Sequence, residues 1–117
     1  LLDASQTEAV AALRRHGIQV DLLSAERRVR GQAFVVDSVA RAARPFQGHN
    51  EVMVRGRWQP VERVAPAGSF LVPTNQPLGT LAVYLLDPES DDGLTTWNFF
   101  DPWLRPGAEH PVVAVER

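Results

Sequence analysis

The sequence predicts an α+β fold: a β-rich single domain of mainly antiparallel strands with two helices. Three observations support this class. Apolar residues recur at helical spacing over about residues 5–16 and 77–87, a period of two dominates residues 28–64, and turns rich in glycine and proline separate these segments. With 117 residues, of which 44% are hydrophobic and 22% charged, the chain has the size and composition of one globular domain.

The first predicted helix covers about residues 5–16. Ser5-Gln6-Thr7-Glu8 has the pattern of a capping box, in which the serine hydroxyl and the glutamate carboxylate each satisfy a free backbone N–H. Gly17 stands where a left-handed C-terminal cap is expected. A strand is predicted to follow over residues 18–23.

A period of two predicts strands between residues 28 and 64. One face of the first strand is expected to present Val29, Gly31, Ala33, Val35, Asp37 and Val39, and the other face Phe34 and Val36. Pro45-Phe46-Gln47-Gly48 predicts a break, and Arg55-Gly56-Arg57 predicts a tight hairpin.

The remaining segments predict a short strand, a helix and a final strand. The short strand covers residues 69–72. The helix covers about residues 77–87. Its start signal is the segment from Thr74 to Pro77, which places Pro77 in the first turn, and Pro88 ends the helix. An acidic loop at residues 89–93 precedes an aromatic segment, residues 96–100, that is expected to be buried. The last strand is predicted over residues 111–116.

Composition disfavours several classes of function. A net charge of −2 gives no basic surface for nucleic acid, and no apolar run approaches the roughly 18 residues of a membrane span. The absence of cysteine excludes disulfides and thiolate nucleophiles. The chain begins without methionine and shows no signal peptide, so we expect any targeting segment upstream, and a secreted or periplasmic parent protein remains one possibility.

The three histidines do not form a zinc motif. A peptidase zinc site needs two ligands close together in the sequence, and neither His16, His49 nor His110 has a partner at such spacing. No catalytic residue, metal ligand or cofactor is therefore predicted within these 117 residues.

The aromatic residues are the candidate interface or binding residues. They are Trp58, Trp97, Phe99, Phe100 and Trp103. Four of them lie within seven positions of one another, and such a group can form part of a core, an interface with a neighbouring domain, or a platform on which sugars stack.

Several motifs resemble those of a known family. They are residues 66–72 (PAGSFLV), 76–79 (QPLG), 85–94 (LLDPESDDGL) and 97–101 (WNFFD), together with residues 13–20 (LRRHGIQV). This pattern resembles the C-terminal region of large bacterial zinc carboxypeptidases related to carboxypeptidase A. The resemblance covers most of the chain, although the middle strands match in pattern only.

The resemblance implies an activity for a parent protein. Enzymes of this family bind zinc through His-x-x-Glu and a later histidine and use a glutamate as general base, and none of these motifs matches a position here. We therefore expect residues 1–117 to be a non-catalytic C-terminal accessory domain of a longer chain. Its expected partner is the catalytic domain of that chain, which would hold the zinc. The alternative is an independent carbohydrate- or peptide-binding module that uses exposed aromatic residues.

Overall fold

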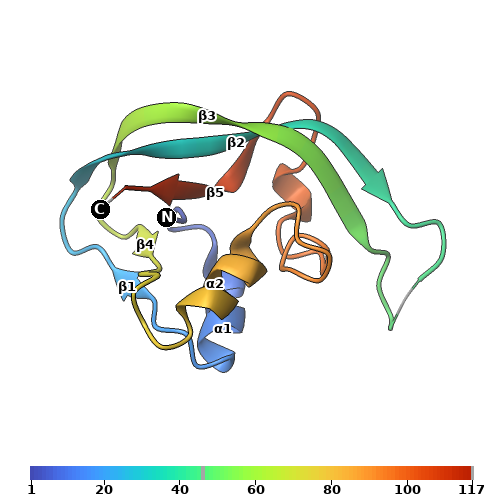
Figure 1. The fold of residues 1–117 in the computed structure, drawn as a ribbon, viewed down its shortest axis with the longest axis horizontal. Coiled ribbons are helices and arrows are strands. Elements are labelled where there is room, and N and C mark those ends of the chain that lie inside the picture. Colours follow the sequence, from blue (N-terminus) through green and yellow to red (C-terminus); the bar gives the residue numbers. More distant parts are fainter. Residues whose placement is uncertain (46, 117) are drawn as a thin grey trace.

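The computed structural model describes residues 1–45 and 47–116, and it confirms the predicted α+β class (Figure 1). A three-stranded antiparallel sheet in the order β3-β2-β5 arches over two helices, and β1 pairs with β4 in a second, smaller sheet. The elements in chain order are α1 (Thr7–Arg15), β1 (Asp21–Leu22), β2 (Arg27–Arg41), β3 (Val52–Ala65), β4 (Phe70–Leu71), α2 (Gly79–Leu86), the 3₁₀ turn η1 (Asp101–Trp103) and β5 (Glu109–Val115).

Leu1 and Leu2, called here the N-terminal dipeptide, join the two sheets. The Leu1 nitrogen donates to the Val113 carbonyl at 2.8 Å, and the Val113 N–H donates back to Leu1 at 3.0 Å. Leu2 exchanges two hydrogen bonds of 2.8 Å with Phe70. The dipeptide thus occupies the place of a strand between β5 and β4, and the connected order becomes β3-β2-β5-dipeptide-β4-β1.

Apolar side chains pack on both faces of this junction. Leu2 is 1% exposed and belongs to the main core between the large sheet and the two helices. Leu1 lies against a smaller cluster, which consists of Leu23, Val29 and Ala65 with Leu71 and Val115 packed beside them. Because successive side chains of a strand point to opposite faces, the two leucines contribute to different clusters.

The end of α1 forms as predicted, but its beginning does not. Gly17 has a φ of 83°, and the bonds from Gly17 N to Arg14 O and from Ile18 N to Leu13 O form a Schellman motif. The predicted capping box is wrong. Asp3 Oδ1 instead accepts from both the backbone N–H and the hydroxyl of Ser5, which makes a turn ahead of the helix.

β2 supplies side chains to both clusters, as its predicted division into two faces implies. Val29 lies in the smaller cluster, whereas Phe34 and Val36 lie in the main core. One face assignment is wrong, because Asp37 is an extra residue between the pairs that Val36 and Ser38 make with β3. This bulge reverses the alternation, so Val39 packs against the main core beside Phe34 and Val36.

The predicted hairpin at Arg55-Gly56-Arg57 is wrong. These residues lie inside the continuous strand β3, and the connection between β2 and β3 lies earlier, between Arg41 and Val52. A Cβ atom on Gly56 would lie 2.1 Å from the Val35 carbonyl and 2.8 Å from the Phe34 ring. The glycine is therefore required by close packing beside the bulge and not by a turn. Phe46, within the predicted break, lies outside the described residues.

The other element boundaries differ by a few residues. The predicted strands over residues 18–23 and 69–72 shorten to the two-residue pair β1 and β4. α2 begins at Gly79 and not near Thr74, so Pro77 precedes the helix. The aromatic segment at residues 96–100 is buried only at Thr96 and Phe100. The last strand begins two residues earlier than predicted, at Glu109.

His110 supports a bulge in β5. Three residues of β5, 110–112, stand opposite Phe34 alone. The His110 ring is fully buried, its Nδ1 accepts the Val112 N–H at 3.0 Å, and its Nε2 is 2.9 Å from the Thr95 hydroxyl. Burial lowers the pKa of His110 to about 3. A neutral imidazole thus replaces the backbone partner that Val112 lacks at the bulge.

We predict that Leu2→Ala lowers the free energy of unfolding by about 3 kcal/mol, because it opens a cavity at the sheet junction. Leu22→Ala is the matched control, since Leu22 is 60% exposed in β1 and should cost less than about 0.5 kcal/mol. Urea denaturation followed by circular dichroism measures both values. Equal losses for the two variants would contradict the role given to the N-terminal dipeptide.

We also predict an acid-sensitive contribution from His110. Its pKa is lower in the folded protein than the 6.5 of the free side chain, so the unfolded chain takes up the proton first as the pH falls. The contribution of His110 to the free energy of unfolding is complete above pH 6.5 and decreases as the pH falls towards 3. At pH 4 the free energy of unfolding should be lower by about 3 kcal/mol from this group. His110→Phe should be less stable at pH 7 but lose less stability between pH 7 and pH 4. Identical pH dependence of the two urea-denaturation series would disprove this assignment.

Candidate functional site

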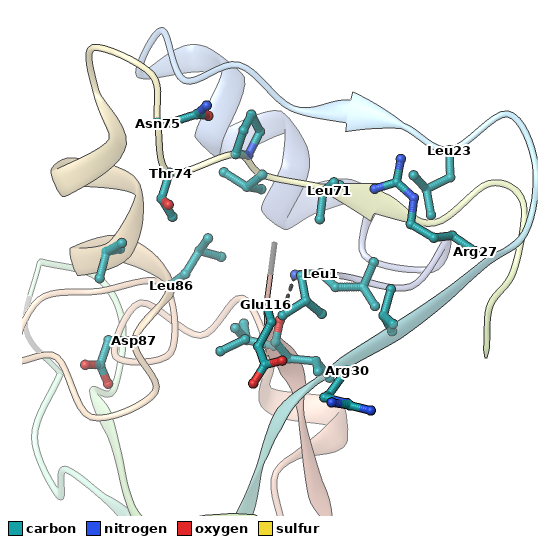
Figure 2. Close-up of a pocket in the computed structure, with 18 of the residues that line it drawn as sticks. Leu1, Leu23, Arg27, Arg30, Leu71, Thr74, Asn75, Leu86, Asp87 and Glu116 are labelled. Atoms are coloured by element: carbon teal, nitrogen blue, oxygen red, sulfur yellow. Dashed lines mark hydrogen bonds between the residues drawn. The ribbon is translucent and has the colours of Figure 1, made fainter. Parts of the chain in front are cut away.

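A groove of about 740 Å³ lies between β5 and the segment that follows β4 (Figure 2). Residues 112–116 form one wall and residues 71–75 form the opposite wall. Helix α2 contributes Val83 and Leu86, and Asp87 follows the helix. Figure 2 shows Leu1 between the two walls, with its nitrogen bonded to the Val113 carbonyl. We call this cavity the interstrand groove, because it continues the row that the N-terminal dipeptide occupies.

Backbone groups on both walls point into the interstrand groove. The bond from Glu116 N to Arg30 O fixes the β5 register, in which the N–H and C=O of Val115 point away from β2. On the opposite wall, the register with β1 points the backbone groups of Val72 towards the groove. Among the described residues, no hydrogen bond to these Val72 groups is found. The groove therefore has a strand edge on each side.

The side chains that line the interstrand groove are mainly apolar. Leu23, Val29, Leu71 and Val115 provide one apolar surface, which is the smaller cluster described above. The second apolar surface consists of Val83 and Leu86 from α2 together with Val112 from β5. Val83 is 51% exposed, so part of this apolar lining is accessible.

Charged groups surround the apolar lining. Arg27, Arg28 and Arg30 come from the start of β2, and Arg30 forms an ion pair with Glu62 at 2.8 Å. Within the described part of the chain, neither Arg27 nor Arg28 forms an ion pair. Asp87 and Glu116 are the acidic residues of the lining. Burial lowers the pKa of the Leu1 amine to about 6.

The five candidate aromatic residues do not form one exposed platform. Trp58 lines the interstrand groove, is 38% exposed, and packs edge-on against Phe34 with ring centroids 5.2 Å apart. Phe100 is fully buried, and Phe99 and Trp103 are half-buried against the main core. Trp97 lies in a second group of polar residues.

That second group, which we call the His49 cluster, consists of His49, Trp97, Asn98 and Asp101. The His49 ring stacks on Trp97 with centroids 4.0 Å apart, and its Nδ1 is 2.6 Å from Asn98 Oδ1. The Asn98 amide nitrogen donates to Asp101 Oδ2 at 3.1 Å and to a backbone carbonyl of the preceding loop at 2.9 Å. Asn98 has a φ of 74°, which is unusual for a residue other than glycine.

The hydrogen bonds of the cluster determine its donors and acceptors. Because the Asn98 amide nitrogen donates elsewhere, its Oδ1 accepts, and His49 Nδ1 must donate. The other ring nitrogen of His49 is Nε2. Both this atom and Asp101 Oδ1 are buried without a hydrogen-bond partner among the described residues. Sequence reasoning missed this cluster, since His49 lies 48 to 52 positions before the other members.

Two further observations concern metals and membranes. In residues 1–45 and 47–116, no three His, Cys, Asp or Glu side chains come together in a way that could hold a metal ion. Within the same residues, no helix has the length and apolar character needed to cross a membrane.

Comparisons with protein-family models, curated proteins and solved structures found no match to this chain.

We predict that Asn98→Ala lowers the free energy of unfolding by about 2–4 kcal/mol, because it removes three side-chain hydrogen bonds and keeps the strained backbone. Asn98→Gly removes the same bonds but relieves the strain, so it should be more stable than Asn98→Ala by about 1 kcal/mol. Thermal and urea denaturation of both variants measure this difference. A glycine variant less stable than the alanine variant would contradict the interpretation of the backbone strain.

Proposed function

We propose that this domain is a non-catalytic accessory domain of a zinc carboxypeptidase, and that it supports or positions the peptidase domain by docking a segment of it in the interstrand groove. The sequence resemblance suggests the parent enzyme. The observation that favours docking is the groove itself, which combines an apolar lining with a strand edge on each side.

The composition of α2 also favours a docking role. All eight residues of this helix, GTLAVYLL, are apolar or uncharged, yet Val83 and Tyr84 are 51% and 45% exposed. A surface helix ordinarily presents a charged face to water, and an exposed apolar surface marks an interaction site. Val83 belongs both to this surface and to the lining of the interstrand groove, so the two features adjoin.

An independent peptide-binding module is the second candidate. It is favoured by Trp58, a half-exposed aromatic residue in the lining of the groove. In this case the ligand is a separate peptide and not a segment of the peptidase domain. Sugar binding has less support, because sugars stack on exposed aromatic platforms and the candidate aromatic residues do not form one.

The first test of the proposal is the sequence that encodes the region upstream of Leu1. We expect His-x-x-Glu, a later histidine and a glutamate general base there. The peptidase domain expressed from that region should bind the separately purified 117-residue domain in isothermal titration calorimetry. The 117-residue domain alone should bind no stoichiometric zinc and release no C-terminal residue from peptides.

Matched variants make this test specific for the groove. Val83→Glu should weaken binding of the peptidase domain at least tenfold, because it buries a charge in the groove. Arg55→Glu changes the charge of an exposed β3 residue outside the groove and should have little effect. An upstream region without the peptidase motifs, or peptidase activity of the 117-residue domain itself, would refute the proposal.

A further inference from the structure

We infer that two copies of this chain pair through the outer edge of β3, antiparallel to each other and related by a two-fold axis at Val61. The two large sheets then form one continuous sheet across the axis. This inference goes beyond the proposed function and does not rest on it, because β3 and the interstrand groove lie at opposite edges of the large sheet.

The second half of β3 has unpaired backbone groups on the side away from β2. The bond from Glu116 N to Arg30 O turns the backbone of Arg30 towards β5, so the neighbouring residues of β2 pair with β3. The register between β2 and β3 then identifies the residues whose backbone groups point outwards, which are Trp58, Pro60, Glu62 and Val64. Among residues 1–45 and 47–116, no backbone hydrogen bond to these outward groups is found.

Other contacts along β3 agree with this orientation. Val52 belongs to the same alternating set, and its N–H donates across the outer edge to Thr96 O at 3.3 Å. Pro60 has no N–H, and a proline inside a strand is tolerated where that position faces solvent. All four outward residues from Trp58 to Val64 are exposed, and Figure 1 shows this half of β3 at the outer rim of the sheet.

The symmetric register centred on Val61 fits both the side chains and the backbone groups of this edge. It places Trp58 opposite the partner's Val64, and Val61 opposite its own copy. Trp58 and Val64 are 38% and 48% exposed, and an aromatic residue opposite a β-branched residue stabilises strand pairing. Each Trp58–Val64 pair can exchange two backbone hydrogen bonds, and each Pro60 carbonyl can accept the N–H of the partner's Glu62.

The charges along β3 disfavour most other symmetric registers. Centring the pair on Arg57, Glu62 or Arg63 places a charged side chain opposite its own copy, which is destabilising. Centring it on Gln59 or Pro60 places two arginine residues opposite each other. In the register inferred here, each charged side chain of the overlap faces an uncharged one. Charges and proline on an edge strand normally prevent indiscriminate pairing, and on β3 they also favour one self-complementary register.

The overlap is short, so we expect a weak dimer. It pairs residues 58–64 of one copy with the same residues of the other, which is a smaller contact than that of most stable dimers. The expected dissociation constant is about 10 µM to 1 mM. Sedimentation equilibrium of the 117-residue protein over this concentration range should give a mass that rises from that of one copy towards that of two.

Charge variants at the two-fold axis test the register. Val61→Glu and Val61→Lys each place like charges opposite each other, so each should weaken self-association at least about fivefold. A mixture of the two variants should restore dimerisation, because only a residue on the axis meets its own counterpart and the two variants carry opposite charges. Arg55→Glu is the matched control, since Arg55 is exposed on β3 outside the overlap, and its dissociation constant should stay within about twofold of the wild type. Circular dichroism checks that the variants fold.

Amide hydrogen exchange of the wild-type protein locates the contact without a substitution. The amides of Trp58, Glu62 and Val64 point outwards, so they should exchange more slowly at about 1 mM than at about 10 µM protein. The amides of Gln59 and Val61 bond to β2 in both states, so their exchange should depend little on concentration.

The outcomes separate this inference from the proposed function. A mass of one copy at every concentration, a mixture of the Val61 variants that stays monomeric, or protection confined to amides outside β3 would each overturn the inferred dimer. Val83→Glu, which tests the interstrand groove, should leave self-association within about twofold of the wild type, because Val83 lies on α2 and not on β3.

Discussion

The backbone pairing of Leu1 and Leu2 is the interaction on which the rest of the structure depends. Four hydrogen bonds of 2.8–3.0 Å join this dipeptide to Val113 and Phe70, which belong to two sheets that otherwise share no strand. Because its side chains alternate, the dipeptide also connects the main core with the smaller apolar cluster. Without it, β1 and β4 would form an isolated two-residue pair, which is too short to be stable by itself.

The bulges of the large sheet determine how that sheet covers the core. Asp37 is the extra residue in β2, and residues 110–112 form the irregular segment of β5. Bulges increase the twist of strands, and the two longest strands arch over the helices in Figure 1. The irregular segment of β5 leaves one N–H without a backbone partner, and the neutral His110 ring accepts it. Protonation of the buried His110 ring would remove the acceptor that satisfies the Val112 N–H, so the irregular segment of β5 depends on the neutral form of this histidine.

The sequence predicted the features that depend on neighbouring residues. Helix α1, the Gly17 cap, the end of α2 and the last strand lie within about two residues of their predicted positions, because apolar periodicity and cap residues are local. Gly56 was misinterpreted as a turn, since the Phe34 ring that requires it lies 22 positions away. The interstrand groove was not predictable for the same reason. Its walls come from residues 1, 71–75 and 112–116, and only the register brings their backbone groups together.

The two candidate sites differ in what they leave unsatisfied, and this difference favours the groove as the docking surface. The His49 cluster has two buried atoms without a hydrogen-bond partner among the described residues, and its other polar atoms bond to one another, to Arg41 and to the Asn50 carbonyl. In residues 1–45 and 47–116, the interstrand groove leaves strand edges unpaired on both walls, beside an accessible apolar lining. A segment of the peptidase domain bound there would contact the same sheet junction that the N-terminal dipeptide holds together, so it would stabilise the fold by mass action.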